Sequence, residues 1–252
     1  MTRAENSDGD TTDFGFRTVA VKKKQDLVRN VFDSVASRYD LMNDLMSGGL
    51  HRLWKRDFVA ALRPTSDKAL LDVAGGTGDI AFLWGNKGGG PAIVCDISAE
   101  MLMVGRDRAI DRAKLRGIDW VCSNAEQLPL PDRSMDVVTI AFGLRNVTDK
   151  LAVLTEMRRI LKCGGKFQCL EFGAVSVPLL GKLYDRYSFS MLPKLGAVVG
   201  RDRESYQYLV ESIRTFPPQP VCAAMMRDAG FAQVSWRDMT GGVVALYSGW
   251  RI

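Results

Sequence analysis

Short apolar runs alternate with amphipathic stretches through the middle of the chain. Five of these runs have the length and composition of strands: Ala69–Val73, Ala92–Asp96, Asp119–Cys122, Asp136–Ala141 and Lys166–Glu171. Helical spacing of apolar residues fills the gaps between them, over about 78–85, 98–116 and 149–162, with Ser98 as a candidate N-cap. This alternation predicts a parallel sheet with helices on both faces.

The pattern differs at the two ends of the chain. Near the N-terminus, apolar residues recur at helical spacing, Gly48-Gly49 interrupts them, and a second amphipathic helix closes before Pro64. We therefore expect a helical cap over residues 14–64, preceded by a disordered polar tail over residues 1–13, with 14–252 forming a single domain.

Near the C-terminus, a helix over about Val221–Gly230 is followed by the apolar runs Ala232–Arg237 and Gly242–Ser248. Only a short glycine turn separates these two runs, so they predict a hairpin, which makes one strand of the sheet antiparallel. Residues 173–220 carry several prolines and aromatic residues and break the alternation. We interpret them as a lid insertion over the edge of the sheet where ligands bind.

The turn after the first strand is rich in glycine and carries the main chemical signal. Asp72 comes just before it, and Gly76, Thr77 and Gly78 lead into the next helix. Glycine lets the backbone approach a ligand closely, and a helix start presents free N–H groups. Asp96 ends the next strand, twenty positions after Gly76, a spacing suited to the ribose hydroxyls of an adenosine cofactor.

Two cofactors fit such a turn, and three features favour S-adenosylmethionine over NAD(P). Asp72 would repel a pyrophosphate but attract a cationic amino acid. Asn124 and the residues beside it follow the third strand, where they could meet an adenine amino group. A plain dinucleotide fold would also end in a parallel strand, whereas the hairpin here predicts an antiparallel one. An NAD(P)-dependent oxidoreductase stays open as the alternative.

Composition and charge exclude several classes of protein. The net charge is +5, but the basic residues form no stripe interleaved with aromatics, so we expect no nucleic-acid partner. The five cysteines form no CxxC pair, so we expect no metal site. Neither a secretory signal nor an uncharged apolar run long enough to span a membrane is present, which predicts a cytoplasmic protein.

Several runs resemble the ubiquinone/menaquinone biosynthesis C-methyltransferases, the 2-polyprenyl-6-methoxy-1,4-benzoquinol / demethylmenaquinone methyltransferase family. The specific runs are Phe142-Gly-Leu-Arg-Asn-Val-Thr-Asp149 and Tyr39-Asp-Leu-Met-Asn-Asp-Leu-Met-Ser47. The turn Asp72-Val-Ala-Gly-Gly-Thr-Gly-Asp79 is shared by many methyltransferases. The likeness extends from about Phe14 to the C-terminus.

This resemblance implies the Rossmann-like class I S-adenosylmethionine-dependent methyltransferase fold, a three-layer α/β sandwich with strand order 3-2-1-4-5-7-6. It implies methyl transfer to a ring carbon of a polyprenylated benzoquinol or of demethylmenaquinol. The cofactor positions that carry over, together with the turn itself, give the expected set Asp72, Gly76, Thr77, Gly78, Asp96, Asn124, Ala125 and Ala141. The family usually has serine at position 141, so this chain lacks one hydroxyl there.

Methylation of a quinol carbon needs a group that favours the phenolate. Arg145 and Asn146 follow the fourth strand at the ligand edge, and we expect Arg145 to stabilise the phenolate and Asn146 to orient the substrate or a water. Arg145 could instead pair with Asp149 or a helix end. His51, Asp40, Asp185 and Glu171 are alternative bases, although the sequence favours a structural histidine, on the helix surface or capped, over a catalytic role for His51.

The insertion is apolar enough to shelter a prenyl tail and is punctuated by Lys182, Arg186 and Lys194, as in an interfacial helix. Ordinary packing on the sheet explains it equally well. We therefore expect the quinol as substrate, with peripheral contact to the inner face of the membrane and to other quinone-biosynthesis enzymes as further hypotheses. A non-catalytic subunit with this fold is a second alternative, but its cofactor motif should be degraded, and here it is intact.

Overall fold

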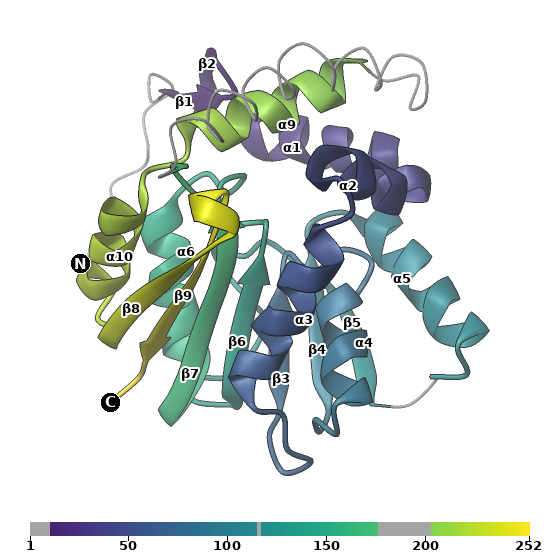
Figure 1. Ribbon diagram of the computed structural model, residues 1–252, viewed down its shortest axis with the longest axis vertical. Coiled ribbons are helices and arrows are strands. Elements are labelled where there is room, and N and C mark those ends of the chain that lie inside the picture. The colour runs from purple at the N-terminus through teal and green to yellow at the C-terminus, as the bar shows by residue number, and fades with distance from the viewer. Residues whose placement is uncertain (1–10, 115–116, 176–202) are drawn as a thin grey trace.

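The computed structural model describes residues 11–114, 117–175 and 203–252, which build a seven-stranded sheet between two layers of helices (Figure 1). The strands are β3 (Leu70–Val73), β4 (Ala92–Asp96), β5 (Ile118–Cys122), β6 (Met135–Ala141), β7 (Leu161–Phe172), β8 (Ala232–Met239) and β9 (Val244–Trp250). Their order is β5-β4-β3-β6-β7-β9-β8, and β9 runs antiparallel to both of its neighbours. The expected strand order and the single antiparallel strand are confirmed.

The central strands β3, β4, β6, β7 and β9 are largely buried on both faces, which explains why they read as nearly continuous apolar runs, whereas the edge strands β5 and β8 are more exposed. One face packs on α3 (His51–Leu62), α4 (Asp79–Asn86) and α5 (Ala99–Asp111), and the other on α6 (Lys150–Ile160) and α10 (Gln219–Asp228). Successive residues of a strand therefore belong to different apolar cores. Leu70 lies in the core formed with α3, α4 and α5, Leu71 lies in the core formed with α6 and α10, and both are fully buried.

Two helices begin where side chains cap them. The Ser98 hydroxyl accepts the N–H of Met101 at 3.1 Å before α5, as expected from its position in the sequence. Asp149 Oδ1 likewise accepts the N–H of Ala152 at 2.9 Å before α6. The helix that begins after Ser98 ends at Asp111, earlier than predicted.

The N-terminal region contains a hairpin that the sequence did not predict. It comprises β1 (Thr11–Phe14) and β2 (Arg17–Ala20), so residues 11–13 are a strand and not part of a disordered tail. The polar strand is held by its backbone pairing and by Phe14, which stacks on Tyr208 with ring centroids 4.1 Å apart. Residues 1–10 of the expected tail lie outside the described residues.

Helices cross the carboxyl edge of the sheet as a separate layer, drawn at the top of Figure 1. They are α1 (Val21–Val35), the 3₁₀ turn η1 (Ala36–Arg38), α2 (Tyr39–Ser47) and α9 (Arg203–Thr215). Gly48 and Gly49, at φ +58° and +80°, end α2 and turn the chain into α3 as predicted. Together with the hairpin, α1, α2 and α9 form a third apolar cluster, which we call the cover.

Most of the predicted insertion, residues 176–202, lies outside the described residues. A further 3₁₀ turn, η4 (Thr240–Gly242), joins β8 to β9. Within the described ranges, no helix combines the length and the hydropathy required to cross a membrane.

Candidate functional site

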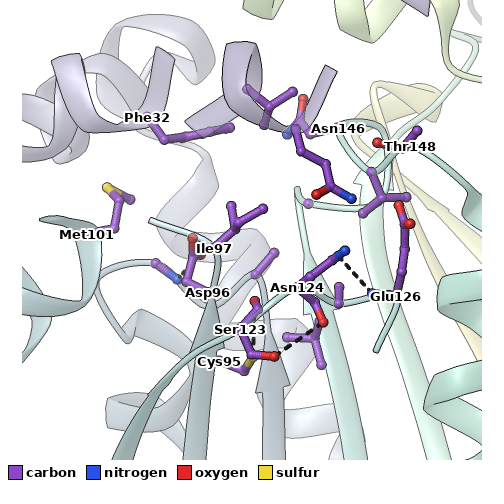
Figure 2. A pocket seen from close by; sticks show the side chains of 18 of the residues that line it. Phe32, Cys95, Asp96, Ile97, Met101, Ser123, Asn124, Glu126, Asn146 and Thr148 are labelled. Carbon is purple, nitrogen blue, oxygen red and sulfur yellow. Dashed lines mark hydrogen bonds between the residues drawn. The ribbon is translucent and has the colours of Figure 1, made fainter. Parts of the chain in front are cut away.

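A cleft of about 710 Å³, counting the solvent at its mouth, opens between the carboxyl ends of β3–β6 and the cover. Figure 2 shows Asp96 at the end of β4, Ile97 just after it, and Asn124 and Glu126 after β5, around one open space, with Phe32 of α1 above it. Ligands bind at this edge in open α/β sheets because turns and helix N-termini converge there.

Asp96 is fixed by two backbone N–H groups, one from the turn after β3 and one from the residue that caps α5. Its Oδ2 accepts the N–H of Gly76 at 2.9 Å, and its Oδ1 accepts the N–H of Ser98 at 2.9 Å. Burial raises the pKa of Asp96 to about 6, against these hydrogen bonds. Gly76 takes φ +54°, where a side chain would be strained and its Cβ would lie 2.8 Å from the Met101 methyl. The carboxylate and the bare turn fit a ribose and its neighbouring groups.

Asp72 is fully buried in β3 and keeps one free oxygen. Its Oδ1 accepts the hydroxyl of Thr139 at 2.7 Å, whereas Oδ2 is buried without a hydrogen-bond partner. Burial raises the pKa of Asp72 to about 7. With Thr77 and Ala141 it lines a small cavity beside the cleft. Such an orphaned oxygen accepts any hydrogen-bond donor, and a cationic amine suits the ionised carboxylate best, so the site fits the amino acid end of S-adenosylmethionine.

Lys55 and Asp79 line the same small cavity, and the sequence analysis missed both. Lys55 Nζ lies 2.7 Å from Asp79 Oδ2, and the lysine is 6% exposed. Burial alone would lower the pKa of Lys55, but the Asp79 carboxylate raises it above its ordinary value. The sequence signals were that Asp79 ends the glycine-rich motif and that Lys55 lies one helical turn after His51. The buried ammonium could hold a carboxylate.

Arg108 of α5 ties the start of α4 to the cover. It donates to the hydroxyl of Thr77 at 2.9 Å and pairs with Asp40 of α2 at 2.9 Å. Thr77 is thereby held in place at the floor of the small cavity. Asp40 is already engaged, which weakens its candidacy as a base.

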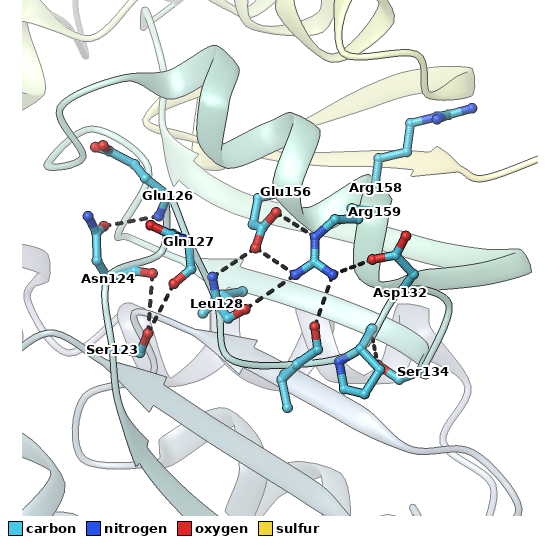
Figure 3. A network of polar contacts seen from close by, with 12 residues as sticks. Ser123, Asn124, Glu126, Gln127, Leu128, Asp132, Ser134, Glu156, Arg158 and Arg159 are labelled. Carbon is cyan, nitrogen blue, oxygen red and sulfur yellow. Dashed lines mark hydrogen bonds and ion pairs between the residues drawn. The ribbon is translucent and has the colours of Figure 1, made fainter. Parts of the chain in front are cut away.

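A polar network fixes the loop that follows β5 (Figure 3). Asn124 Oδ1 accepts the N–H of Glu126 at 3.0 Å, and Asn124 and Ala125 line the main cleft. Further along, Arg159 bonds to Glu156 at 2.7 Å and to the Leu130 carbonyl at 2.9 Å. These contacts connect the loop to α6, so the amide of Asn124 is presented from a supported segment.

Gly78 has a packing role in addition to its place in the motif. It precedes α4 at φ +80°, and a Cβ there would lie 2.5 Å from the Trp120 ring. It is not among the residues that line the cavities described here. The tight turn after β3 therefore depends on a bare backbone at this position.

Arg145 follows β6 and is held by Glu171 of β7. Its Nη1 lies 2.9 Å from Glu171 Oε1, and the two side chains are 5% and 0% exposed. It also donates to the Phe142 carbonyl and lies over the Phe172 ring, 5.3 Å from the centroid. The expected alternative partner, Asp149, is not the one found. Glu171 is fully engaged by this pair and by the backbone N–H of Arg145 and Phe172, so it is poorly placed as a base.

Asn146 lines the main cleft and accepts the hydroxyl of Tyr208 at 3.1 Å. A third cavity lies between α2 and Arg145, the residue that precedes Asn146. Its lining is mostly aromatic and sulfur-containing and includes Phe32, Tyr39, Met42, His51, Phe142 and Phe172. The structure therefore places Arg145 beside an apolar compartment that adjoins the cofactor cleft at Phe32, Tyr39 and Phe142.

Asp185 lies outside the described residues. Over the described ranges there is no cluster of His, Cys, Asp or Glu side chains that could hold a metal ion.

Comparison with known sequences places the chain among methyltransferases. The model of the ubiE/COQ5 methyltransferase family matches residues 18–251. A ubiquinone/menaquinone biosynthesis C-methyltransferase UbiE of Acidiphilium cryptum is 56% identical over 247 residues, covering 98% of this chain and 99% of the relative. Its counterpart in Rhodopseudomonas palustris (strain BisB5) is 57% identical over 252 residues, covering 98% and 100%.

Solved structures share the fold at low sequence identity. An S-adenosylmethionine-dependent methyltransferase of Thermotoga maritima has a TM-score of 0.62 at 20% identity and covers 89% of this chain and 100% of its own. Phosphoethanolamine N-methyltransferase 2 of Haemonchus contortus has a TM-score of 0.56 at 15% identity and covers 77% and 52%. The predicted class I methyltransferase fold is confirmed.

Proposed function

The chain belongs to the ubiE/COQ5 methyltransferase family, and from this premise we propose that it transfers a methyl group from S-adenosylmethionine to a ring carbon of a polyprenylated benzoquinol or of demethylmenaquinol. The predicted enzyme class is confirmed by the family, which does not favour the oxidoreductase alternative. One observation of the site carries the proposal furthest: a cleft that places Asp96 and Asn124 where an adenosine cofactor would need them adjoins an aromatic cavity suited to a quinol ring.

The cofactor residues divide by the part of the ligand that they suit. Asp96 would accept the ribose hydroxyls, and Asn124 with Ala125 would meet the adenine. Asp72 would take the ammonium through its free oxygen, and Lys55 the carboxylate. When bound, the cofactor supplies an electrophilic methyl group on a sulfonium. The chain's own task is to align the acceptor carbon and to exclude water.

Arg145 and Asn146 are proposed to act on the acceptor. Glu171 holds the Arg145 guanidinium beside the aromatic cavity, where its charge favours a phenolate over a phenol. Asn146 is oriented by Tyr208 and lines the main cleft, next in the chain to Arg145, so it could direct the ring or an ordered water. A non-catalytic role for the chain is less favoured because every polar group of the cofactor motif is in place.

Contact with the membrane is a finer part of the proposal. Four large apolar side chains are exposed on the side of the molecule that carries the cover. They are Phe16 of the hairpin, Leu41 of α2, Leu50 in the turn before α3 and Leu53 at the start of α3. A lipid surface would shield them and supply the prenylated substrate. Co-sedimentation with anionic vesicles at low salt should retain the protein, and indifference to such vesicles would remove this part. Contact with other quinone-biosynthesis enzymes is likewise proposed.

The direct test supplies purified protein with S-adenosylmethionine and a chemically reduced, short-tailed demethylated benzoquinol, with a demethylmenaquinol in parallel. We expect one added methyl group on at least one acceptor, read by mass. S-adenosylhomocysteine, but not NAD(P)H, should raise the melting temperature, since only a ligand of the native state stabilises it. Stabilisation without methylation of either quinol would retain the cofactor and contradict the acceptor.

A further inference from the structure

The aromatic cavity contains a buried imidazole whose second nitrogen has no partner. His51 begins α3 and is 5% exposed. Its Nε2 lies 2.9 Å from Asp44 Oδ1, and its Nδ1 is buried without a hydrogen bond. Because a carboxylate only accepts, Nε2 must carry the proton in the neutral ring, which leaves Nδ1 with a free lone pair.

The chain builds this arrangement locally. The αL turn at Gly48 and Gly49 folds the start of α3 back onto the end of α2, with the N–H of Gly49 bonded to the Asp44 carbonyl at 3.0 Å. The hydroxyl of Ser47 accepts the backbone N–H of His51 at 3.2 Å. Asp44 is fixed in turn by Arg52, whose Nη2 lies 2.6 Å from Oδ2. The imidazole is therefore oriented by a supported carboxylate, as a general base requires.

We propose that His51 is the general base of the reaction, oriented by Asp44, and that its Nδ1 accepts the proton of a ring hydroxyl of the quinol. This inference rests on the proposed function. Of the other candidates among the described residues, Asp40 is engaged by Arg108 and Glu171 by Arg145. Asn43 lines the same cavity, and its side-chain nitrogen is also buried without a hydrogen bond. A hydroxyl both donates and accepts, so one such group would satisfy the acceptor at Nδ1 and the donor at Asn43 together.

Every proton in this reaction is exchanged among the quinol, His51 and water. The quinol O–H bond breaks and its proton passes to Nδ1, while the electron pair left on oxygen raises the density at the ring carbon. That carbon gains the methyl group, and the carbon–sulfur electron pair stays on sulfur. The ring hydrogen then leaves to water as a proton, which restores the ring as a phenolate, and His51 returns its proton to that oxygen. No oxidant or reductant is needed.

The charges around His51 favour the form of the ring that this role requires. Burial lowers the pKa of His51 below its ordinary value, Lys55 lowers it further, and Asp44 opposes both. The charged groups that face it come from α2, α3, α4 and the end of β6: Asp44, Arg52, Lys55, Asp79 and Arg145. The neutral ring is thus the resting form near neutral pH, ready to accept a proton.

The test uses the fact that His51 is the one histidine of the chain, so its imidazole gives one set of resonances without assignment. In the full-length protein with S-adenosylhomocysteine, adding an acceptor phenol should shift these resonances. The bound phenol should show phenolate absorbance near neutral pH in the wild type but not in His51→Gln. Unchanged imidazole resonances, or equal phenolate absorbance in both proteins, would overturn the proposal even if the variant folded poorly.

Kinetics provide the second readout. His51→Gln should lower kcat by about 10²- to 10⁴-fold with little change in KM, and the acidic limb of the pH–rate profile should disappear. Asp44→Asn, which keeps the shape but not the charge, should lower kcat less and move that limb. An acceptor with a more acidic hydroxyl should recover much of the loss in His51→Gln. If the wild type methylates quinols and His51→Gln keeps its rate and its acidic limb, this inference fails while the proposed function stands.

Discussion

The carboxyl edge of the sheet and the cover meet at one cleft, but they present polar groups in different ways. At the sheet edge, Asp96 is already bonded to two backbone N–H groups, and Asn124 to a third. Beneath the cover, the free nitrogens of Asn43 and His51 are buried with no hydrogen bond. The sheet edge is a preorganised cradle, whereas the cover side is completed only when a polar ligand group enters.

This difference suggests how the two ligands are handled. A cradle made of backbone turns can bind the same cofactor in every turnover with little rearrangement. Unsatisfied buried groups penalise the empty cavity and reward a ligand that supplies the missing partner. Asp72 is the exception at the sheet edge, because its free oxygen awaits a cationic group. Three perturbations test the contrast, and they differ in the size of the expected effect.

The largest effect is expected at the Arg145–Glu171 ion pair of the sheet edge, which lies beside the cavity beneath the cover. Arg145→Met leaves the Glu171 carboxylate buried without a counter-charge, and we expect a loss of about 3–5 kcal/mol in the free energy of unfolding. Adding Glu171→Gln removes that charge and keeps an oxygen acceptor for one of the two backbone N–H groups, so the double variant should regain part of the loss. Urea denaturation of the single and double variants measures both values.

The single and double variants also distinguish a structural role of Arg145 from a catalytic one. The refolded double variant should still bind S-adenosylhomocysteine but lose about 10²- to 10³-fold in kcat, because the phenolate lacks its cation. A double variant that is stable and turns over at the wild-type rate would show that Arg145 only holds the fold together.

An intermediate effect is expected in the turn of the sheet edge. Gly78→Ala places a Cβ 2.5 Å from the Trp120 ring at φ +80°, so strain and overpacking add to about 2–4 kcal/mol. Gly88→Ala is the matched control, because its φ is +82° and no heavy atom lies within 4 Å of the added Cβ. Chemical denaturation should show a clearly larger loss for Gly78→Ala. Equal losses would mean that the turn is not tightly packed.

The smallest effect is a pH dependence at Asp72. Burial raises the pKa of Asp72 to about 7, and that of Asp96 to about 6, above the unfolded value of about 3.9. The folded chain therefore holds more protons than the unfolded chain between about pH 4 and 7, and the ligand-free protein loses stability as pH rises through that window.

Cofactor binding should show the opposite trend, because an ammonium favours ionised Asp72. The affinity for S-adenosylhomocysteine should rise as pH increases from about 6 to 8, by up to about tenfold per unit below the pKa. Calorimetry at several pH values measures this, with the exposed Asp107→Asn as a control that keeps the trend. An unchanged slope in Asp72→Asn would remove Asp72 from the ammonium site.

The same contrast explains what the sequence could predict. The central strands were predicted because their apolar runs are buried on both faces, and the bounds of β4 matched residue for residue. The turn after β3 and Asp96 were found because the spacing of a contiguous motif encodes the local geometry. For the same reason, Ser98 was identified correctly as an N-cap.

The cover was predicted less well because its structure depends on distant contacts. The hairpin of β1 and β2 has a mostly polar sequence, without the apolar pattern that predicts a strand. It is held by Tyr208, almost two hundred residues further along the chain. The pairing of Arg145 with Glu171, and of Lys55 with Asp79, joins segments whose proximity no local pattern reveals. The orphaned nitrogen of His51 is visible only once the surrounding side chains are placed.

The central claim is that the chain methylates a ring carbon, and the position of the transferred methyl group tests it most directly. Purified protein would be incubated with S-adenosylmethionine carrying a deuterated methyl group and a reduced, short-tailed demethylated quinol, and the product analysed by mass spectrometry and NMR. The account predicts the deuterated methyl group on a ring carbon, with both ring hydroxyls still free. A label on a hydroxyl oxygen, or no labelled quinol at all, would contradict it.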